Sequence, residues 1–178
     1  MELQTVLEKR RSIRRYQRQE IPQEVLEKMI SAAILAPSWK NSQTARYHIV
    51  TSDAMLTQVK EKALPAFNAE NAKDASALIV TSFVKDRSGF DKDGTPSNEL
   101  GNLWGAYDLG LHNENLMLKA CDLGLSTLVM GIRDANALRD LLKIPEDEII
   151  VSVLAVGYGD IQPEMPKRKR VEDITTFY

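Results

Sequence analysis

Residues 77–84, Ala-Leu-Ile-Val-Thr-Ser-Phe-Val, form a nearly continuous apolar run near the middle of the 178-residue chain. Apolar side chains on both faces are typical of a strand buried in the centre of a sheet. A second run of this kind spans residues 149–156, and shorter strands are expected at 46–51 and 125–130. Together these runs predict one central sheet, around which the rest of the chain packs.

Helical periodicity occupies most of the remaining sequence. One amphipathic stripe begins near Pro22 and is expected to end before Pro37, because a residue that precedes proline is disfavoured in the α conformation. A longer helix is predicted over about 98–122, ended by Gly124. Its first apolar stripe comprises Leu100, Leu103, Trp104, Tyr107 and Leu111.

Two aspartates and one long loop complete the pattern. Asp53 and Asp134 each precede a short helical stretch and are expected to act as N-caps. A further short helix is expected around Phe67. Residues 85–97 are rich in Gly, Asp and Ser and predict a mobile loop.

The order of these elements indicates the fold class. Helices and strands are mixed without a regular βαβ alternation, which favours an α+β fold with helices around a single sheet. We expect one domain over residues 1–178. Its last part, 160–178, has few core residues and predicts an extended C-terminal arm suited to wrapping a partner subunit.

Composition excludes several classes of protein. The chain has 23 basic and 25 acidic residues, a net charge of -2, which argues against a nucleic-acid or anionic-membrane binder. One cysteine, Cys121, leaves no disulfide framework and no zinc site built on several thiolates. The apolar runs fall short of the roughly 18 residues that a membrane span needs, and no secretory signal is recognisable. A soluble, cytoplasmic protein is expected.

Common catalytic motifs are also missing from the sequence. It contains no GxGxxG, GxxxxGK[ST], HExxH or GxSxG. His48 and His112 are too few for a histidine metal site, and Cys121 is expected to be a small core residue rather than a nucleophile. No side chain is therefore predicted to act as a catalytic acid, base or nucleophile, and no metal is expected.

Four polar clusters remain as candidates for binding. Guanidinium groups and a hydroxyl at Arg10, Arg11, Ser12 and Arg14 suit an anion, although a solvated basic turn would look the same. A second basic cluster, Lys167–Arg170, suits either a second anion-binding arm or an ordinary charged surface. The other two clusters are less charged.

The loop that follows Pro37 carries Ser38, Trp39 and Asn41, and a tryptophan is costly to leave exposed, so it should pack against something. Otherwise this segment is a plain surface loop. Asn68 and Asn71 could hydrogen-bond the edge of a planar ring, or could simply cap a helix.

These clusters, taken in order, resemble the nitroreductase family of FMN-dependent NAD(P)H oxidoreductases. The resemblance begins with R-R-S-x-R at Arg10–Arg14 and A-x-x-A-P-S-x-x-N-x-Q at Ala33–Gln43. It continues through Asn68 and Asn71, then through the helix with Glu114-Asn115-Leu116 and Met130-Gly131, to the basic pair before Val171-Glu172-Asp173.

The resemblance implies an intertwined α+β homodimer with a central, mostly antiparallel sheet flanked by helices, and with two shared FMN sites. Arg10, Ser12 and the arm residues Arg168 and Lys169 would hold the phosphate and ribityl chain, with Arg11 alongside. Arg14 would face the N1–C2=O edge of the flavin, Asn68 and Asn71 the N3/O4 edge, and Met130 and Gly131 the N5 side through their backbone. Pro37, Ser38, Trp39 and Asn41 would come from the second subunit.

The same resemblance implies a function. NADH or NADPH would reduce the flavin and leave before a nitroaromatic, quinone or similar planar acceptor enters, which is a ping-pong cycle. Two alternatives stay open. One is a flavin storage or sensor protein of the same fold with little reductase activity, and the other is an interaction module that uses the basic arm.

Overall fold

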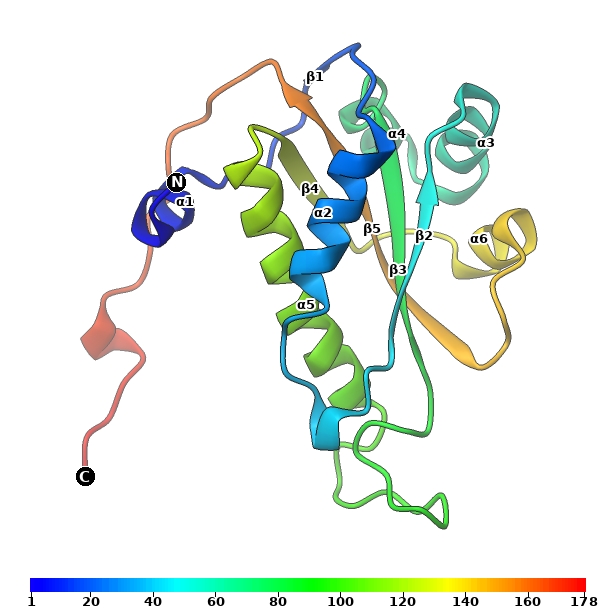
Figure 1. The fold of residues 1–178 in the computed structure, drawn as a ribbon, viewed down its shortest axis with the longest axis vertical. Coiled ribbons are helices and arrows are strands. Elements are labelled where there is room, and N and C mark those ends of the chain that lie inside the picture. The colour runs from blue at the N-terminus through cyan, green and yellow to red at the C-terminus, as the bar shows by residue number, and fades with distance from the viewer.

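The computed structural model describes all 178 residues and contains a five-stranded sheet between two layers of helices (Figure 1). The elements are α1 (Leu3–Lys9), β1 (Tyr16–Gln17), α2 (Gln23–Ala33), η1 (Trp39–Asn41), β2 (Ala45–Val50), α3 (Asp53–Ala63), α4 (Ala66–Asn71), β3 (Ala77–Val84), α5 (Leu103–Asp122), β4 (Ser126–Met130), α6 (Ala135–Leu142), β5 (Glu148–Gly159) and η2 (Val171–Asp173).

The sheet is built around the two apolar strands. β3 pairs with β5 from Ala77↔Val156 to Val84↔Glu148, and β2 and β4 pair antiparallel with β3 and β5 respectively. β3 is almost wholly buried, as the sequence predicted, because both of its faces are covered. β2 pairs with β3 alone, so its other edge is free.

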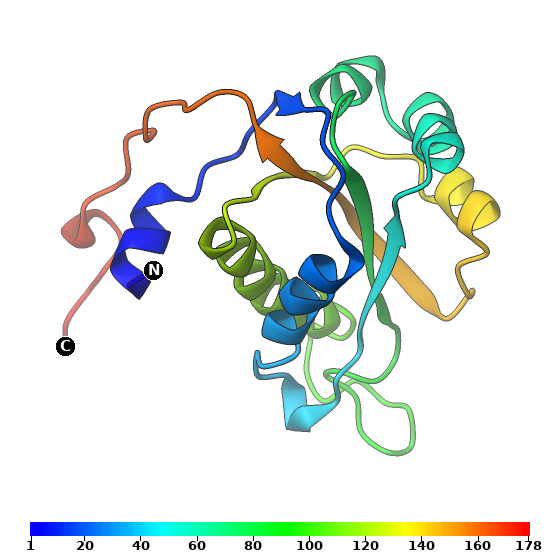
Figure 2. The ribbon, with the colours of Figure 1, turned by 45° about the horizontal axis from the view of Figure 1, so that its top comes forward.

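Helices cover the two faces of the sheet in separate groups. α2 and α5 bury residues such as Met29 and Leu116 against one face, and α3 and α6 bury Val59 and Leu138 against the other (Figure 2). These two cores hold the sheet in place, and they leave both ends of α5 close to the molecular surface. None of the helices combines the length with the apolar composition that a membrane span requires.

Several predicted boundaries were wrong by a few residues. α2 ends at Ala33 rather than just before Pro37, and α5 begins at Leu103 rather than at 98. β5 extends to Gly159, and β1 was not predicted. Asp53 does not cap α3, because Ser52 occupies the N-cap position, without a side-chain hydrogen bond. Asp134 does cap α6, accepting the backbone N–H of Ala137 at 2.9 Å, and Gly124 ends α5 with a φ of +79°.

The predicted buried stripe of α5 was also wrong in its first half. Leu100, Leu103 and Tyr107 are exposed, and the face turned to the core instead carries Asp108, Leu109 and His112. Small and polar residues occupy this part of the core face, so hydrophobicity alone pointed to the opposite side. The long loop folds back on itself, with Ser97 N–H bonded to the Gly89 carbonyl at 2.8 Å.

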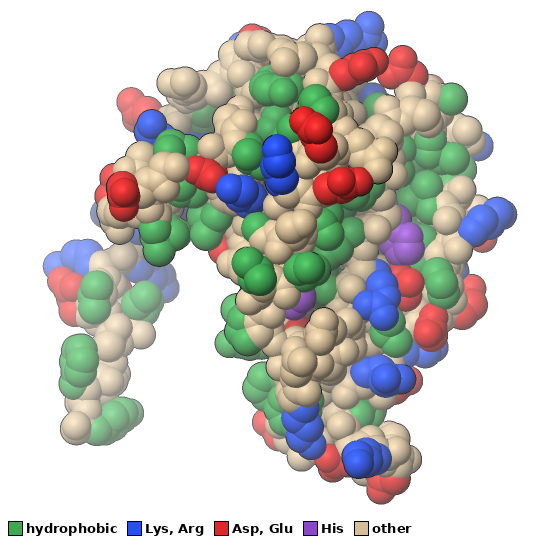
Figure 3. All heavy atoms as spheres, in the orientation of Figure 1, with side chains coloured by type: hydrophobic (Ala, Val, Ile, Leu, Met, Phe, Trp, Pro, Cys, Tyr) green, Lys and Arg blue, Asp and Glu red, His purple; other side chains and the backbone are tan.

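Residues beyond β5 run outward from the body. From Gln162 to Tyr178 every residue is exposed, and the only regular element is the short η2. Phe177 is 87% exposed, and Met165, Val171 and Ile174 are uncovered as well. The hydrophobic side chains of this segment therefore stand apart from the body (Figure 3).

Candidate functional site

The basic segment that follows α1 is fixed beside β4. The backbone N–H of Ile13 donates to the Thr127 carbonyl at 3.0 Å, and Ser12 pairs with Thr127 in an isolated parallel bridge. Tyr16 anchors the far end: its hydroxyl donates to the Ile13 carbonyl at 2.8 Å, and burial raises the pKa of the phenol. The backbone of residues 12–16 is thus held to the sheet while Ser12 and Arg14 remain exposed.

Cations of this segment line a cavity of about 460 Å³. Arg10 and Arg11 form part of its wall, together with Cys121 of α5 and residues 161–163 at the base of the arm. Arg11 donates through Nη1 to the Arg10 carbonyl at 2.7 Å, but its Nε is buried without a partner. Arg10 has one ion pair, to Glu114 at a long 3.7 Å. A buried N–H without an acceptor is costly, so this cavity suits an anion.

Asn68, Met130 and Gly131 lie at the other end of β4. The strand advances about 10 Å from Thr127 to Met130. Asn68 is buried and donates through Nδ2 to the Ile132 carbonyl at 3.0 Å, which holds the start of α4 against the strand end. A Cβ added to Gly131 would meet no atom within 4 Å, so the space above this residue is open. Met130 is buried and presents only its backbone there.

Asn71 lies at the C-terminal end of α4 and is half-buried. It is one turn from Asn68 on the same helix, so both amides belong to the same end of the site. The structure therefore brings together, along β4, the basic segment at one end and the amide and glycine group at the other.

The loop that carries Pro37, Ser38, Trp39 and Asn41 lies elsewhere. The backbone N–H of Trp39 donates to the Asp108 carboxylate at 2.9 Å. From Asp108 to Cys121, which lines the cavity, α5 rises about 20 Å. Within one chain the loop and the cationic cavity are therefore at opposite ends of α5 (Figure 1).

Arg168 and Lys169 are also not at the cavity. Arg168 contacts only its own segment, donating to the Pro166 carbonyl at 3.1 Å, and Lys169 is exposed. Only the base of the arm, at residues 161–163, lines the cavity.

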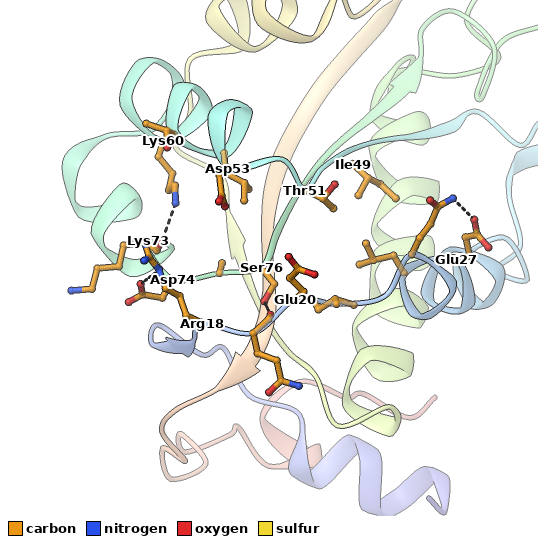
Figure 4. A pocket seen from close by; sticks show the side chains of 17 residues that line it. Arg18, Glu20, Glu27, Ile49, Thr51, Asp53, Lys60, Lys73, Asp74 and Ser76 are labelled. Carbon is orange, nitrogen blue, oxygen red and sulfur yellow. Dashed lines mark hydrogen bonds and ion pairs between the residues drawn. The ribbon is translucent and has the colours of Figure 1, made fainter.

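A second and larger cavity, of about 930 Å³, lies between α2 and α3 at the free edge of β2 (Figure 4). It contains none of the residues predicted to bind a ligand. Two of its cations have partners within the cavity wall: Arg18 pairs with Asp74 at 3.5 Å, and Lys60 donates to the Lys73 carbonyl at 2.8 Å. Burial lowers the pKa of Lys60. Because it has no unpaired donor of the kind found at Arg11, we assign the site to the smaller cavity.

The two histidines and the cysteine lie outside the set of residues predicted to bind the flavin. His48 pairs with the buried carboxylate of Glu148 at 2.7 Å on one face of the sheet. His112 is buried with neither ring nitrogen hydrogen-bonded, and burial lowers its pKa. Cys121 is only half-buried, contrary to the core position predicted for it, and burial raises the pKa of its thiol.

Sequence reasoning missed Asp108, Ser88 and Trp104. Asp108 is buried and accepts hydrogen bonds from the backbone N–H of Trp39 and from the Ser88 hydroxyl, while the Trp104 ring packs at a tilt of 49° against Trp39 with centroids 4.7 Å apart. One sequence signal for this group was available. Asp108 follows Trp104 by four residues on a predicted helix, and that spacing places the two side chains on the same side of the helix.

Known proteins resemble this chain in sequence and in fold. The family model described as "Nitroreductase family" matches residues 7–158. A protein of Archaeoglobus fulgidus, provisionally named NADH dehydrogenase/NAD(P)H nitroreductase, is 34% identical over 154 residues, covering 84% of this chain and 80% of the relative.

Solved structures show the same fold. A nitroreductase family protein of Clostridium difficile superimposes with a TM-score of 0.77 at 25% identity, over 97% of this chain and 95% of that one. A provisionally assigned nitroreductase of Exiguobacterium sibiricum, in complex with FMN, superimposes with a TM-score of 0.88 at 20% identity, over 100% and 98% of the two chains.

Proposed function

Because this chain belongs to the nitroreductase family, we propose that it is an FMN-dependent oxidoreductase that takes hydride from NADH or NADPH. The electrons pass to a nitroaromatic, a quinone or a similar planar acceptor in a ping-pong cycle. Since NAD(P)H is an intracellular metabolite, the proposal includes a cytoplasmic location.

One observation carries the proposal: the arrangement along β4. Cations with an unpartnered buried donor, Arg10 and Arg11, line a cavity at one end of the strand. A buried amide, Asn68, and an open glycine backbone lie at the other end. FMN has this polarity, with a dianionic phosphate at one end and a planar ring with donor and acceptor edges at the other. The residues present therefore fit the cofactor.

Bound FMN would supply the two-electron chemistry, and the protein would supply position and charge. Arg10, Arg11 and Ser12 would bind the phosphate and ribityl chain. Arg14, exposed and free of ion pairs, would lie beside the N1–C2=O edge and stabilise the negative charge of the reduced ring. Asn68 and Asn71 would orient the N3/O4 edge, and the open face at Gly131 would admit each substrate in turn.

A homodimer follows from the same proposal. The predicted ring-side loop, Pro37–Asn41, lies about 20 Å along α5 from the cationic cavity, and we propose that it serves the flavin of a second subunit. The arm carries exposed apolar side chains, and so does α5 at Leu103 and Tyr107, which supply surface that a second subunit would cover. Arg168 and Lys169 would reach a phosphate through this arm.

The test is a visible absorption spectrum of purified protein, before and after anaerobic addition of NADH and of NADPH separately. A flavin spectrum that bleaches is expected, followed by reoxidation on adding a quinone or a nitroaromatic. Protein that stays colourless after incubation with FMN would overturn the proposal.

A storage or sensor protein is the second candidate. It is favoured by Trp39, a bulky ring that packs on Trp104 beside the predicted flavin face and would restrict access to it. A bound flavin that neither NADH nor NADPH reduces would select this alternative. The arm-module alternative predicts that Lys169→Ala leaves FMN binding unchanged.

A further inference from the structure

Among the carboxylates of the chain that form no ion pair, Asp108 is the most deeply buried. It is 3% exposed, on the core face of α5, and it forms no ion pair within 4.0 Å. A buried charge without a counter-ion is retained only where hydrogen bonds stabilise it. Oδ2 of Asp108 accepts two of them, from the backbone N–H of Trp39 at 2.9 Å and from the hydroxyl of Ser88.

The loop that Asp108 holds has an unusual backbone. Three of its residues are left-handed without being glycine: Lys40 at φ 47°, Asn41 at φ 56° and Gln43 at φ 50°. Such conformations cost free energy and persist only where surrounding contacts enforce them. Inside the loop, Gln43 N–H donates to the Ser38 hydroxyl at 3.0 Å, but that bond does not tie the loop to the rest of the molecule.

The side chain of Trp39 is fixed by a second set of contacts. Its ring packs on Trp104, whose edge meets Tyr107 at a centroid distance of 5.5 Å. Trp104 donates through Nε1 to Asn98 at 2.9 Å, and Gly89 leaves no room for a Cβ, which would lie 2.6 Å from Trp104 Cδ1. The exposed pair Lys40–Asp91, at 3.2 Å, adds one more link to the long loop.

We propose that Asp108, oriented by Ser88, is a positioning residue that locks the loop Pro37–Asn41 in the conformation needed to meet the flavin of a second subunit. This inference rests on the proposed function. A charge-assisted hydrogen bond to the Trp39 backbone amide fixes the conformation of the loop before the cofactor binds. The loop therefore loses less conformational freedom when FMN binds.

The test compares Asp108→Asn and Ser88→Ala with wild type. Asn keeps the shape and one acceptor oxygen but removes the charge, and Ala removes one of the two donors. Asp93→Asn is the matched control, because Asp93 also accepts a backbone N–H and a hydroxyl, both from Thr95, but is exposed and does not contact Trp39.

Two readouts are needed. The first is hydrogen exchange at the amides of residues 39–43 in protein without FMN. The second is the Kd for FMN, with kcat measured at saturating FMN. Faster exchange confined to this loop, a Kd raised about tenfold in Asp108→Asn and less in Ser88→Ala, and a kcat within about twofold of wild type are expected. Asp93→Asn should change neither readout.

Unchanged exchange and unchanged Kd in Asp108→Asn would overturn the positioning role. If Asp108→Asn speeds exchange throughout β3 and β5, the variant is globally destabilised and Ser88→Ala decides. If wild-type protein binds no FMN, the proposed function fails, and the exchange data alone decide whether Asp108 fixes the loop.

Discussion

The two ends of α5 carry the two halves of the candidate site, and they are built in opposite ways. At the Cys121 end, cations line a cavity, one guanidinium N–H is buried without an acceptor, and Arg10 has only a long ion pair. At the Asp108 end, a strained loop is held by one hydrogen bond to a buried carboxylate and by the packing of the Trp39 ring on Trp104.

The difference shows how binding energy and positioning can be divided. The open end has groups whose bonding is incomplete until an anion arrives, so it should contribute affinity. At the closed end, that of Asp108, the backbone of the loop is held before any cofactor binds, while the indole N–H of Trp39 and both ring nitrogens of His112 are buried without partners. This end should therefore contribute geometry. Variants in the cationic cavity should therefore lose FMN affinity with unchanged stability, whereas variants in the packed core at the other end of α5 should lose stability.

The largest effect is expected at the closed end, from Gly105→Ala. A Cβ there would overlap the ring of Phe83, and both residues are buried, so the free energy of unfolding should fall by about 3 kcal/mol. Cys121→Ala, on the same helix at the open end, should change it by less than about 1 kcal/mol, because Cys121 is half-buried. Denaturant unfolding measures both free energies. Equal losses in Gly105→Ala and Cys121→Ala would contradict the proposed difference between the two ends of α5.

At the open end, Arg10→Ala should weaken FMN binding about 100-fold, because it removes charge-assisted bonds to a phosphate. The thermal midpoint of the FMN-free protein should barely change, since the only ion pair lost is the long one to Glu114. Fluorescence titration with FMN and calorimetry check the two halves of this prediction. A large loss of stability in the FMN-free protein would show that Arg10 is structural.

His112 adds a pH dependence to the closed end. Burial lowers its pKa below 6.5, and the nearby Asp108 carboxylate opposes that shift only in part. The unfolded chain then binds a proton that the folded protein does not, so stability should be fully present above about pH 6.5 and decrease as pH falls toward the folded pKa. The slope should not exceed about 1.4 kcal/mol per pH unit.

Unfolding of wild type and His112→Leu by urea between pH 7.5 and 5 isolates this contribution. Leu has a similar volume and no titratable group, so the variant should have a shallower decline on acidification. An identical pH profile in both proteins would mean that another group causes the dependence.

The smallest effect is expected for the arm. Lys169→Ala should weaken FMN binding about threefold at low salt and less at high salt, because an exposed cation contributes through screened attraction. Glu164→Gln on the same arm serves as the control and should not weaken it. Salt-independent loss of affinity would contradict an electrostatic role.

Much of the fold could be predicted from the sequence where hydrophobicity and structure coincide. β3 was predicted to the residue because its burial leaves a continuous apolar run, and Asp134 and Gly124 were identified because capping chemistry is local. The first half of α5 could not be read in this way. Its core face carries Gly105, Asp108 and His112, while Leu103 and Tyr107 face outward.

In the candidate site, too, only the features encoded by local motifs could be predicted from the sequence. Motif order predicted a set of binding residues, but not that the Trp39 loop and the cationic cavity lie at opposite ends of one helix. Asp108 and Ser88 were missed because their role depends on a contact between residues 69 positions apart for Trp39 and 20 apart for Ser88. No periodic or local pattern encodes such a contact.

If one flavin site takes its two halves from two subunits, as proposed, mixing two variants defective in different halves should restore complete sites. Arg10→Ala protein and protein with Ser38→Ala and Asn41→Ala in the loop are dissociated, mixed and reassociated. FMN is then added at a concentration that fills wild-type sites but neither variant's sites.

In a mixed dimer with shared sites, one site receives both defects and the other receives none. Random reassociation should therefore restore FMN binding, and reduction by NADH or NADPH, at about one quarter of the sites. If each chain built its own complete site, every site would keep a defect, and mixing would restore nothing.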